Sequence, residues 1–195
     1  DYRLAPEHPY PAALDDSVAG YDWLLASGIE PGRIVVAGDS AGGNLALALL
    51  LQLRDAGTPL PAGAVLLSPV TDLGLRGASH VTRKALDPFF AMADLRPFIA
   101  SYIGAHDPGE PYLSPLDADL HGLPPLLIHV GDHEVLLDDA TRLGERAREA
   151  GVEARTVVWP GMMHVFQMQS LLLPEARHAN ADIGAFIRSR LGLPA

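Results

Sequence analysis

The stretch Arg33-Ile34-Val35-Val36-Ala37-Gly38-Asp39-Ser40-Ala41-Gly42-Gly43 decides the fold, and the apolar run Leu45 to Leu51 follows it. The two apolar runs predict a buried strand and then a helix, joined by a tight turn. Gly-x-Ser-x-Gly in that setting is the sequence form of a nucleophile elbow, a strained turn that exposes its serine. We therefore predict Ser40 as a nucleophile, and we expect side chains at 38 and 42 to collide with neighbouring backbone. The alternative is a Gly-rich turn whose serine has no role.

The bulk composition is that of one soluble globular domain. The chain has 195 residues, of which 48% are hydrophobic and 19% charged. Its formal charge of −10 argues against nucleic acid or an anionic membrane as a partner. The absence of cysteine excludes disulfides, thiolate catalysis and cysteine-bound metals. The sequence has no apolar stretch long enough to span a bilayer, and its first residues do not resemble a signal peptide. We therefore expect a cytoplasmic protein, although the first residue is Asp1 and not Met.

Strand-like and helix-like segments alternate beyond the elbow. Strands are expected over 33–37, 63–67, 125–130 and 152–159, and helices over 12–26, 44–56, 136–150 and 175–191. This alternation predicts the α/β class, with a mostly parallel sheet flanked by helices on both faces. Residues 72–123 break the rhythm with two helix-like pieces, about 84–92 and 94–103, and are interpreted as an excursion above the sheet.

An activated serine needs a general base, and eight histidines are available. Functional groups in parallel sheets gather at the C-terminal ends of strands, which selects His164, just beyond the last expected strand. His129 lies inside a strand pattern and is expected to be packed or at a sheet edge, while His178 is expected on the surface of the last helix. A loop histidine without a role is the alternative for His164.

The acid that orients the base is expected after the third strand, in the chain order Ser, acid, His. Asp138 and Asp139 fall in a first helical turn, where acids favour the helix dipole without any catalytic role. Asp132 and Glu134 remain, and their spacing alone does not choose between them. A metal site at His129 and His133 is disfavoured because the two do not share a helical face. We expect neither a metal nor another cofactor.

With these residues assigned, the chain resembles the bacterial hormone-sensitive lipase-like esterases, in their GDSAGG subgroup. The matching segments spread through nearly all of the sequence: Asp1 to Glu7 (DYRLAPE), Gly38 to Gly43 (GDSAGG), Ser68 to Leu73 (SPVTDL, where SPWTDL is usual) and Pro160 to Phe166 (PGMMHVF). The resemblance implies the C-terminal part of an α/β-hydrolase fold over 1–195, with 72–123 as a partial helical cap.

The acid segment departs from the family pattern Asp-Pro-Leu-x-Asp-Glu. Aligning Leu136, Asp138 and Asp139 with that pattern puts Glu134 at the catalytic position, and glutamate can accept the imidazole hydrogen bond equally well. The resemblance therefore favours Glu134 over Asp132.

The family's HGGG oxyanion loop would precede Asp1. Within this sequence the amide of Ala41, with Gly42 or Gly43 as further candidates, is left to supply the oxyanion hole. We expect the chain to lack the N-terminal strands, to expose the strand 33–37 as a sheet edge open to another chain, including a homodimer, and to be poorly stable or weakly active alone.

The reaction implied is two-step acyl transfer from a small, short-chain ester to water. Pocket candidates beside the triad of Ser40, Glu134 and His164 are Asp39, Phe89, Phe90, Met92, Tyr102, Val165 and Phe166. Two alternatives stay open: a serine peptidase of the prolyl-oligopeptidase type, and a non-catalytic binding protein built on the hydrolase fold.

Overall fold

The computed structural model describes residues 1–90 and 94–194, which contain a four-stranded parallel sheet. The strands lie in the order β1 (Val35–Asp39), β2 (Gly63–Leu67), β3 (Leu126–Gly131) and β4 (Ala154–Trp159), and every neighbouring pair is parallel. The predicted α/β class and parallel sheet are therefore confirmed.

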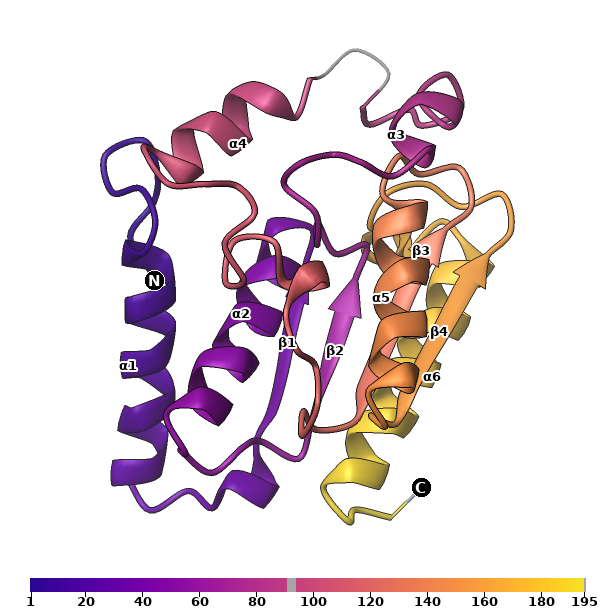
Figure 1. The fold of residues 1–195 in the computed structure, drawn as a ribbon. Coiled ribbons are helices and arrows are strands. Elements are labelled where there is room, and N and C mark those ends of the chain that lie inside the picture. The colour runs from indigo at the N-terminus through magenta and orange to yellow at the C-terminus, as the bar shows by residue number, and fades with distance from the viewer. Residues whose placement is uncertain (91–93, 195) are drawn as a thin grey trace.

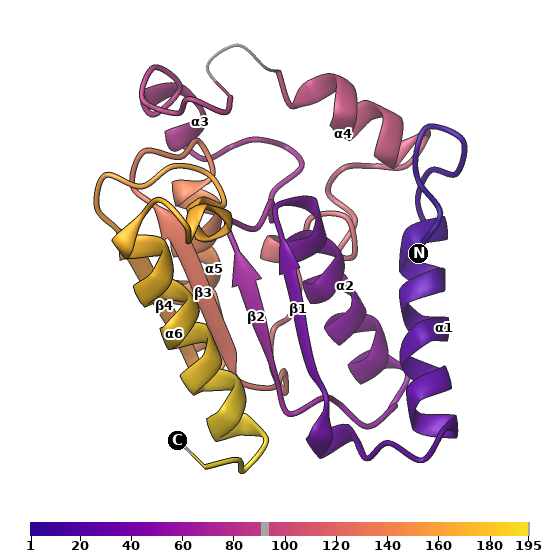
Figure 2. The same cartoon turned by 180° about the vertical axis from the view of Figure 1, so that it is seen from behind.

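Helices cover both faces of the sheet. Figure 1 shows α2 (Ala41–Asp55) and α5 (Leu137–Glu149) in front of the strands, with α1 (Ala12–Ala26) packed outside α2. The view from behind shows α6 (Pro174–Arg190) on the opposite face, over the β3 and β4 side (Figure 2). Short 3-10 turns occupy Pro31–Arg33, Pro115–Asp117 and Phe166–Gln169.

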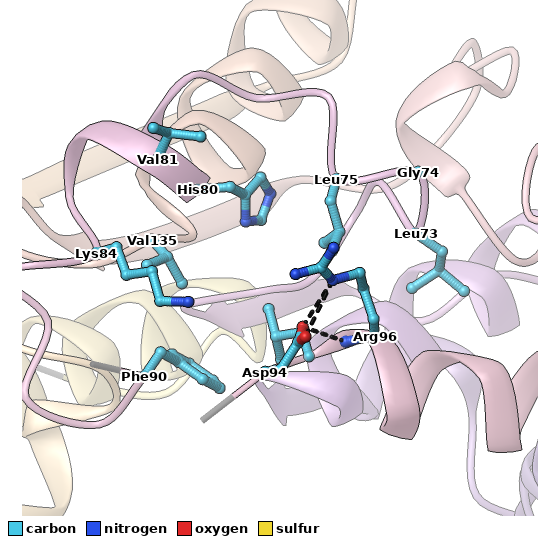
Figure 3. A pocket seen from close by; sticks show the side chains of 11 residues that line it. Leu73, Gly74, Leu75, His80, Val81, Lys84, Phe90, Asp94, Arg96 and Val135 are labelled. Carbon is cyan, nitrogen blue, oxygen red and sulfur yellow. Dashed lines mark hydrogen bonds and ion pairs between the residues drawn. The ribbon is translucent and has the colours of Figure 1, made fainter. Parts of the chain in front are cut away.

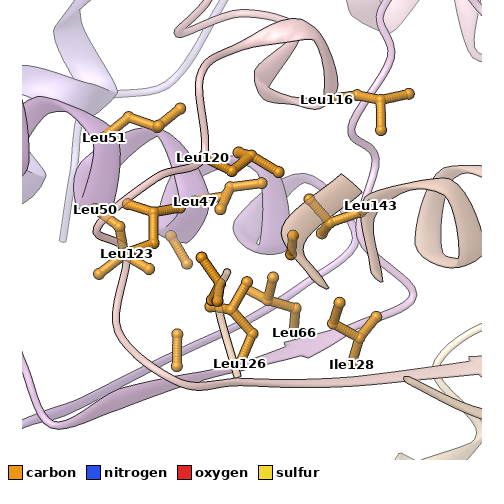
Figure 4. Close-up of a cluster of buried hydrophobic side chains, with 14 of the residues drawn as sticks. Leu47, Leu50, Leu51, Leu66, Leu116, Leu120, Leu123, Leu126, Ile128 and Leu143 are labelled. Atoms are coloured by element: carbon orange, nitrogen blue, oxygen red, sulfur yellow. The ribbon is translucent and has the colours of Figure 1, made fainter. Parts of the chain in front are cut away.

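The main core lies between the sheet and the α2–α5 layer. Leucines of α2, such as Leu47 and Leu50, meet Leu66 of β2 and Ile128 of β3 there, all fully buried (Figure 4). Burying a side chain of this size stabilises the fold by about 1.5–3 kcal/mol. This core fixes the strands whose C-terminal ends carry the candidate site.

Strand β1 is an edge of the sheet. It pairs with β2 alone in the described part of the chain, and Ala37 and Asp39 are exposed. It begins two residues later than expected because Pro31–Arg33 forms a 3-10 turn. By contrast, every residue of β3 is buried. The expectation of an exposed edge at this strand is confirmed.

The excursion lies above the C-terminal ends of the strands and carries α3 (Ser79–Thr82) and α4 (Arg96–Ile103) (Figure 1). The helix expected over 94–103 is present as α4, but the one expected over about 84–92 is wrong over 84–90, where the chain turns repeatedly. Pro88 cannot continue a helix, and the Asp87 carboxylate binds the backbone amides of Phe89 and Phe90 instead. Residues 91 and 92 lie outside the described part.

Candidate active site

Ser40 lies at the turn between the end of β1 and the start of α2. Its backbone has φ 53° and ψ −118°, a strained conformation for a residue with a side chain. Hydrogen bonds hold the turn: the Ser40 amide donates to the Leu67 carbonyl at 2.8 Å, and the Ser40 carbonyl accepts from Val70 at 3.1 Å. Helix α2 begins at Ala41, earlier than expected, so the first amides of the helix follow the serine directly.

The glycines around Ser40 differ in why the fold requires them. A side chain at Gly38 would overlap the Gly42 carbonyl group, and one at Gly43 would come within 2.8 Å of the Pro69 side chain. The expected collision at Gly42 is wrong, since nothing in the described structure lies within 4 Å of a Cβ there. The close packing of the elbow therefore depends on Gly38 and Gly43.

The imidazole of His164 and the carboxylate of Glu134 are in contact. Nδ1 of His164 lies 2.9 Å from Oε2 of Glu134, and both side chains are almost completely buried. Glu134 follows β3 and His164 follows β4, so adjacent strands carry the pair to the same end of the sheet. A buried carboxylate on Nδ1 leaves Nε2 of the imidazole available for proton transfer.

The second oxygen of Glu134 is held by two donors that sequence reasoning missed. Oε1 accepts hydrogen bonds from the Gly131 amide at 2.5 Å and from the Ser68 hydroxyl at 2.8 Å. The Ser68 hydroxyl also accepts a hydrogen bond from the amide of Val165 at 3.3 Å, so it joins Glu134 to the residue after His164. Ser68 directly follows β2, and the strand-end rule that selected His164 could have indicated it.

Asp132 has a different contact. Its Oδ1 accepts the amide of Gly161 at 2.6 Å, which fixes the loop before His164, and its carboxylate is partly exposed. The structure thus places Glu134, and not Asp132, against the imidazole.

The structure does not join all three residues by hydrogen bonds. In the described part of the chain, no hydrogen bond connects the half-buried Ser40 side chain to His164. Such bonds are often long or absent in enzymes without substrate and tighten when substrate binds.

Two aromatic rings of the excursion pack on the imidazole of His164. The ring centroids of Phe89 and Phe90 lie 5.1 and 4.9 Å from that of His164. Phe89 is exposed and Phe90 is buried. Phe90 and Val135 also line a cavity of about 400 Å³ beneath α3, whose rim carries Lys84 and the Asp94–Arg96 ion pair (Figure 3).

The other expected pocket residues lie in different surroundings. Phe166 is fully buried against Trp159 and α6, because its ring completes a small core, so it is not a pocket residue. Tyr102 packs edge-on against Tyr10, and burial raises the pKa of Tyr102 to about 12. Val165 is buried, Asp39 is exposed at the end of β1, and Met92 lies outside the described residues.

His129 is packed in the core, as expected. Its Nε2 lies 2.9 Å from Asp182 of α6, and burial lowers the pKa of the imidazole despite that carboxylate. His178 is exposed. Within residues 1–90 and 94–194, no three His, Asp or Glu side chains are grouped so that they could hold a metal ion. None of the helices described there is both long and apolar enough to cross a bilayer.

The fold and the candidate site together indicate the class of proteins to which the chain belongs. The profile of the family described as alpha/beta hydrolase fold matches residues 1–168, and the chain belongs to that family.

Similar proteins of known name indicate which group of alpha/beta hydrolases the chain resembles. An acetyl-hydrolase of Streptomyces hygroscopicus is 51% identical over 98% of this chain and 64% of its own length. An esterase of Acinetobacter venetianus is 44% identical over 97% of this chain and 63% of its own length. A solved esterase from the bacterial hormone-sensitive lipase family has 50% identity and a TM-score of 0.95, covering 98% of this chain and 64% of that one. The resemblance to bacterial hormone-sensitive lipase-like esterases is confirmed, and the chain spans about 64% of the first of these relatives.

Proposed function

We propose that the protein hydrolyses small carboxylic esters through an acyl-enzyme on Ser40. The observation that carries the proposal is the buried Glu134–His164 hydrogen bond at the end of the sheet that also presents the strained Ser40. In support, relatives with 51% and 44% identity are named acetyl-hydrolase and esterase.

The first half of the reaction forms the acyl-enzyme. Nε2 of His164 takes the Ser40 hydroxyl proton while Oγ attacks the ester carbonyl, and Glu134 stabilises the resulting imidazolium. The negative oxygen of the tetrahedral intermediate is placed at the Ala41 amide, one of the first α2 amides, which have no partner inside the helix. The intermediate then collapses, and the alcohol leaves with the proton from His164.

The second half returns the enzyme to its starting state. His164 takes a proton from water, the hydroxide attacks the acyl carbonyl, and the carboxylic acid leaves as Ser40 regains its proton. Glu134 keeps its orientation throughout because Ser68 and Gly131 hold its other oxygen. The phenylalanine pair shields the imidazole from water on one side.

The proposed substrate carries a short acyl chain. Phe89 and Phe90 offer an apolar wall beside the base, against which a few carbon atoms can pack. EstE5, which is 45% identical with a TM-score of 0.95, was soaked with p-nitrophenyl butyrate, and that ester is a suitable probe here.

The proposal is tested by hydrolysis of p-nitrophenyl butyrate and of a peptide p-nitroanilide by the protein that carries this sequence. We expect the ester to be hydrolysed and the anilide to remain intact, and Ser40→Ala to lower ester turnover by about 10⁴-fold. Faster cleavage of the anilide would identify a peptidase. Turnover that survives Ser40→Ala would refute the assignment of the nucleophile.

A further inference from the structure

Asp87 is a buried carboxylate in the excursion that the proposed reaction does not use. Its side chain is completely buried, and one oxygen, Oδ1, accepts the amides of Phe89 at 2.9 Å and Phe90 at 3.1 Å. The other oxygen, Oδ2, accepts the amide of Val135 at 2.9 Å, although Val135 is 48 positions away in the sequence. No basic side chain of the described residues forms an ion pair with it, so backbone amides are its only polar partners there.

These three hydrogen bonds hold chain segments that lie beside each member of the Glu134–His164 pair. On one side Asp87 fixes the backbone of the two phenylalanines whose rings pack on His164. On the other side it fixes Val135, the residue directly after Glu134. The acid loop and the aromatic wall are therefore tied to a single carboxylate.

The same contacts shape the cavity. Phe90 and Val135, whose amides both donate to Asp87, are neighbours in its wall, and Figure 3 shows both side chains there. The Phe90 ring faces the cavity and also touches the imidazole, so it separates the two. A shift of this ring would change both the shape of the cavity and the packing on the imidazole.

We propose that Asp87 is a positioning and specificity-determining residue that holds the Glu134–His164 pair and the Phe90 wall in one arrangement. The inference rests on the proposed esterase function, since it assigns Asp87 a role in that reaction. Hydrogen bonds to a charged acceptor are about twice as strong as neutral ones, which suits a carboxylate for this task. Aspartate is also needed for its two acceptor oxygens, which point at two separate chain segments.

Asp87→Asn is the sharpest variant because it keeps the shape and loses one acceptor. Whichever way the amide is turned, its NH₂ group faces a backbone N–H and releases either Val135 or the phenylalanine segment. We expect kcat for p-nitrophenyl butyrate to fall by about 10- to 100-fold, as displacements near 1 Å produce in active sites. We also expect the preference for butyrate over acetate to change, because the Phe90 ring no longer has a fixed position in the apolar wall beside the imidazole.

The matched control is Asp72→Asn, a fully buried carboxylate at the start of the same excursion. Asp72 accepts the Gly74 amide at 3.0 Å and pairs with Arg76 and Arg142, away from the base. Its variant should melt at a lower temperature while keeping the wild-type kcat, because Asp72 forms no hydrogen bond with the loop of Glu134, with Phe89 or with Phe90. Equal kinetics in the Asp87 and Asp72 variants, measured below both melting temperatures, would overturn the inference.

Two further measurements keep the test decisive. The Nδ1 proton of His164, seen by NMR as a downfield resonance, reports its hydrogen bond to Glu134 without any turnover. We expect this resonance to shift or broaden in Asp87→Asn and to stay unchanged in Asp72→Asn, and an unchanged resonance in both would contradict us.

If Asp87→Asn does not fold, Phe90→Leu removes the ring directly, and an unaltered acyl preference there would count equally against the inference. Loss of the esterase proposal itself would show differently, as a wild-type protein that hydrolyses neither ester.

Discussion

At the scale of single residues, backbone strain is concentrated around the candidate site. Ser40, Ser68 and Val165 have positive φ values of 53°, 46° and 49°, and each is a residue with a side chain. Such conformations cost about 1–3 kcal/mol each and persist only where surrounding contacts impose them. Here the contacts are mutual: the Ser68 hydroxyl binds both Glu134 and the Val165 amide. Ser68 and Val165 are thus held in place by the same hydrogen bonds that orient Glu134, whereas Ser40 is held by its own bonds to Leu67 and Val70.

The acid assignment gives a residue-scale prediction. Glu134→Gln keeps the size of the side chain but removes the charge that stabilises the imidazolium, so we expect kcat to fall by about 10³- to 10⁴-fold. Asp132→Asn retains an acceptor for the Gly161 amide and should stay within about twofold of wild type. Steady-state hydrolysis of p-nitrophenyl butyrate by both variants measures the difference. A larger loss in Asp132→Asn would reverse the assignment.

At the scale of elements, β3 and α6 are joined by a polar contact inside an apolar interface. His129 of β3 meets Asp182 of α6, and Asp182 also binds Arg155 of β4 at 2.8 Å. Burial opposes ionisation of Asp182, yet the hydrogen bonds from Arg155 and His129 lower the pKa of this carboxyl. Three elements on the α6 side of the sheet are therefore linked through one carboxylate.

The burial of His129 lets us predict how the free energy of unfolding depends on pH. Because burial lowers the pKa of His129 in the folded protein, the unfolded chain binds a proton more readily below about pH 6.5. The contribution of His129 to the free energy of unfolding is therefore fully present above about pH 6.5 and is lost as the pH falls below that value. We expect urea unfolding to show a lower free energy at pH 5.5 than at pH 8, and His129→Gln to reduce that difference. A pH difference that is the same in wild type and variant would show that His129 is not its cause.

Long regular segments can be predicted from the sequence at this scale, whereas the excursion cannot. The helix 12–26 and the strand 63–67 have the bounds that the sequence predicts, because their apolar patterns are regular and their ends carry clear stop signals. The helix expected near 84–92 is wrong over 84–90, because Pro88 and the Asp87 side chain favour turns there. His164 and Glu134 can be found from strand ends and from the family pattern. The role of Asp87 depends on a contact with Val135, far along the chain, and no local pattern indicates it.

At the scale of the whole described fold, β1 is the edge of the sheet and lies directly beside the candidate nucleophile. Parallel strands are normally covered on both sides, and an exposed apolar edge favours pairing with another chain. Ala37 in the middle of β1 is exposed. The face and edge that present Ser40 are thus also where association with other polypeptide is expected.

The exposed edge at β1 predicts that this 195-residue chain associates in solution. A charge at this position discourages strand pairing, so Ala37→Lys should lower the fraction of associated species in sedimentation velocity at high protein concentration. Val81→Lys is the control, because Val81 is 80% exposed on α3, away from the sheet edge. An equal effect of both substitutions would point to charge alone as the cause.

Covalent labelling reports directly whether Ser40 is a nucleophile activated by His164. The protein is incubated with a fluorophosphonate and digested, and the modified peptide is identified by mass spectrometry. We expect one adduct on Ser40 in the wild type, no adduct on the corresponding peptide of Ser40→Ala, and labelling slowed by about 10³-fold or more in His164→Ala. Labelling at another residue, or at Ser40 with the same rate in His164→Ala, would contradict it.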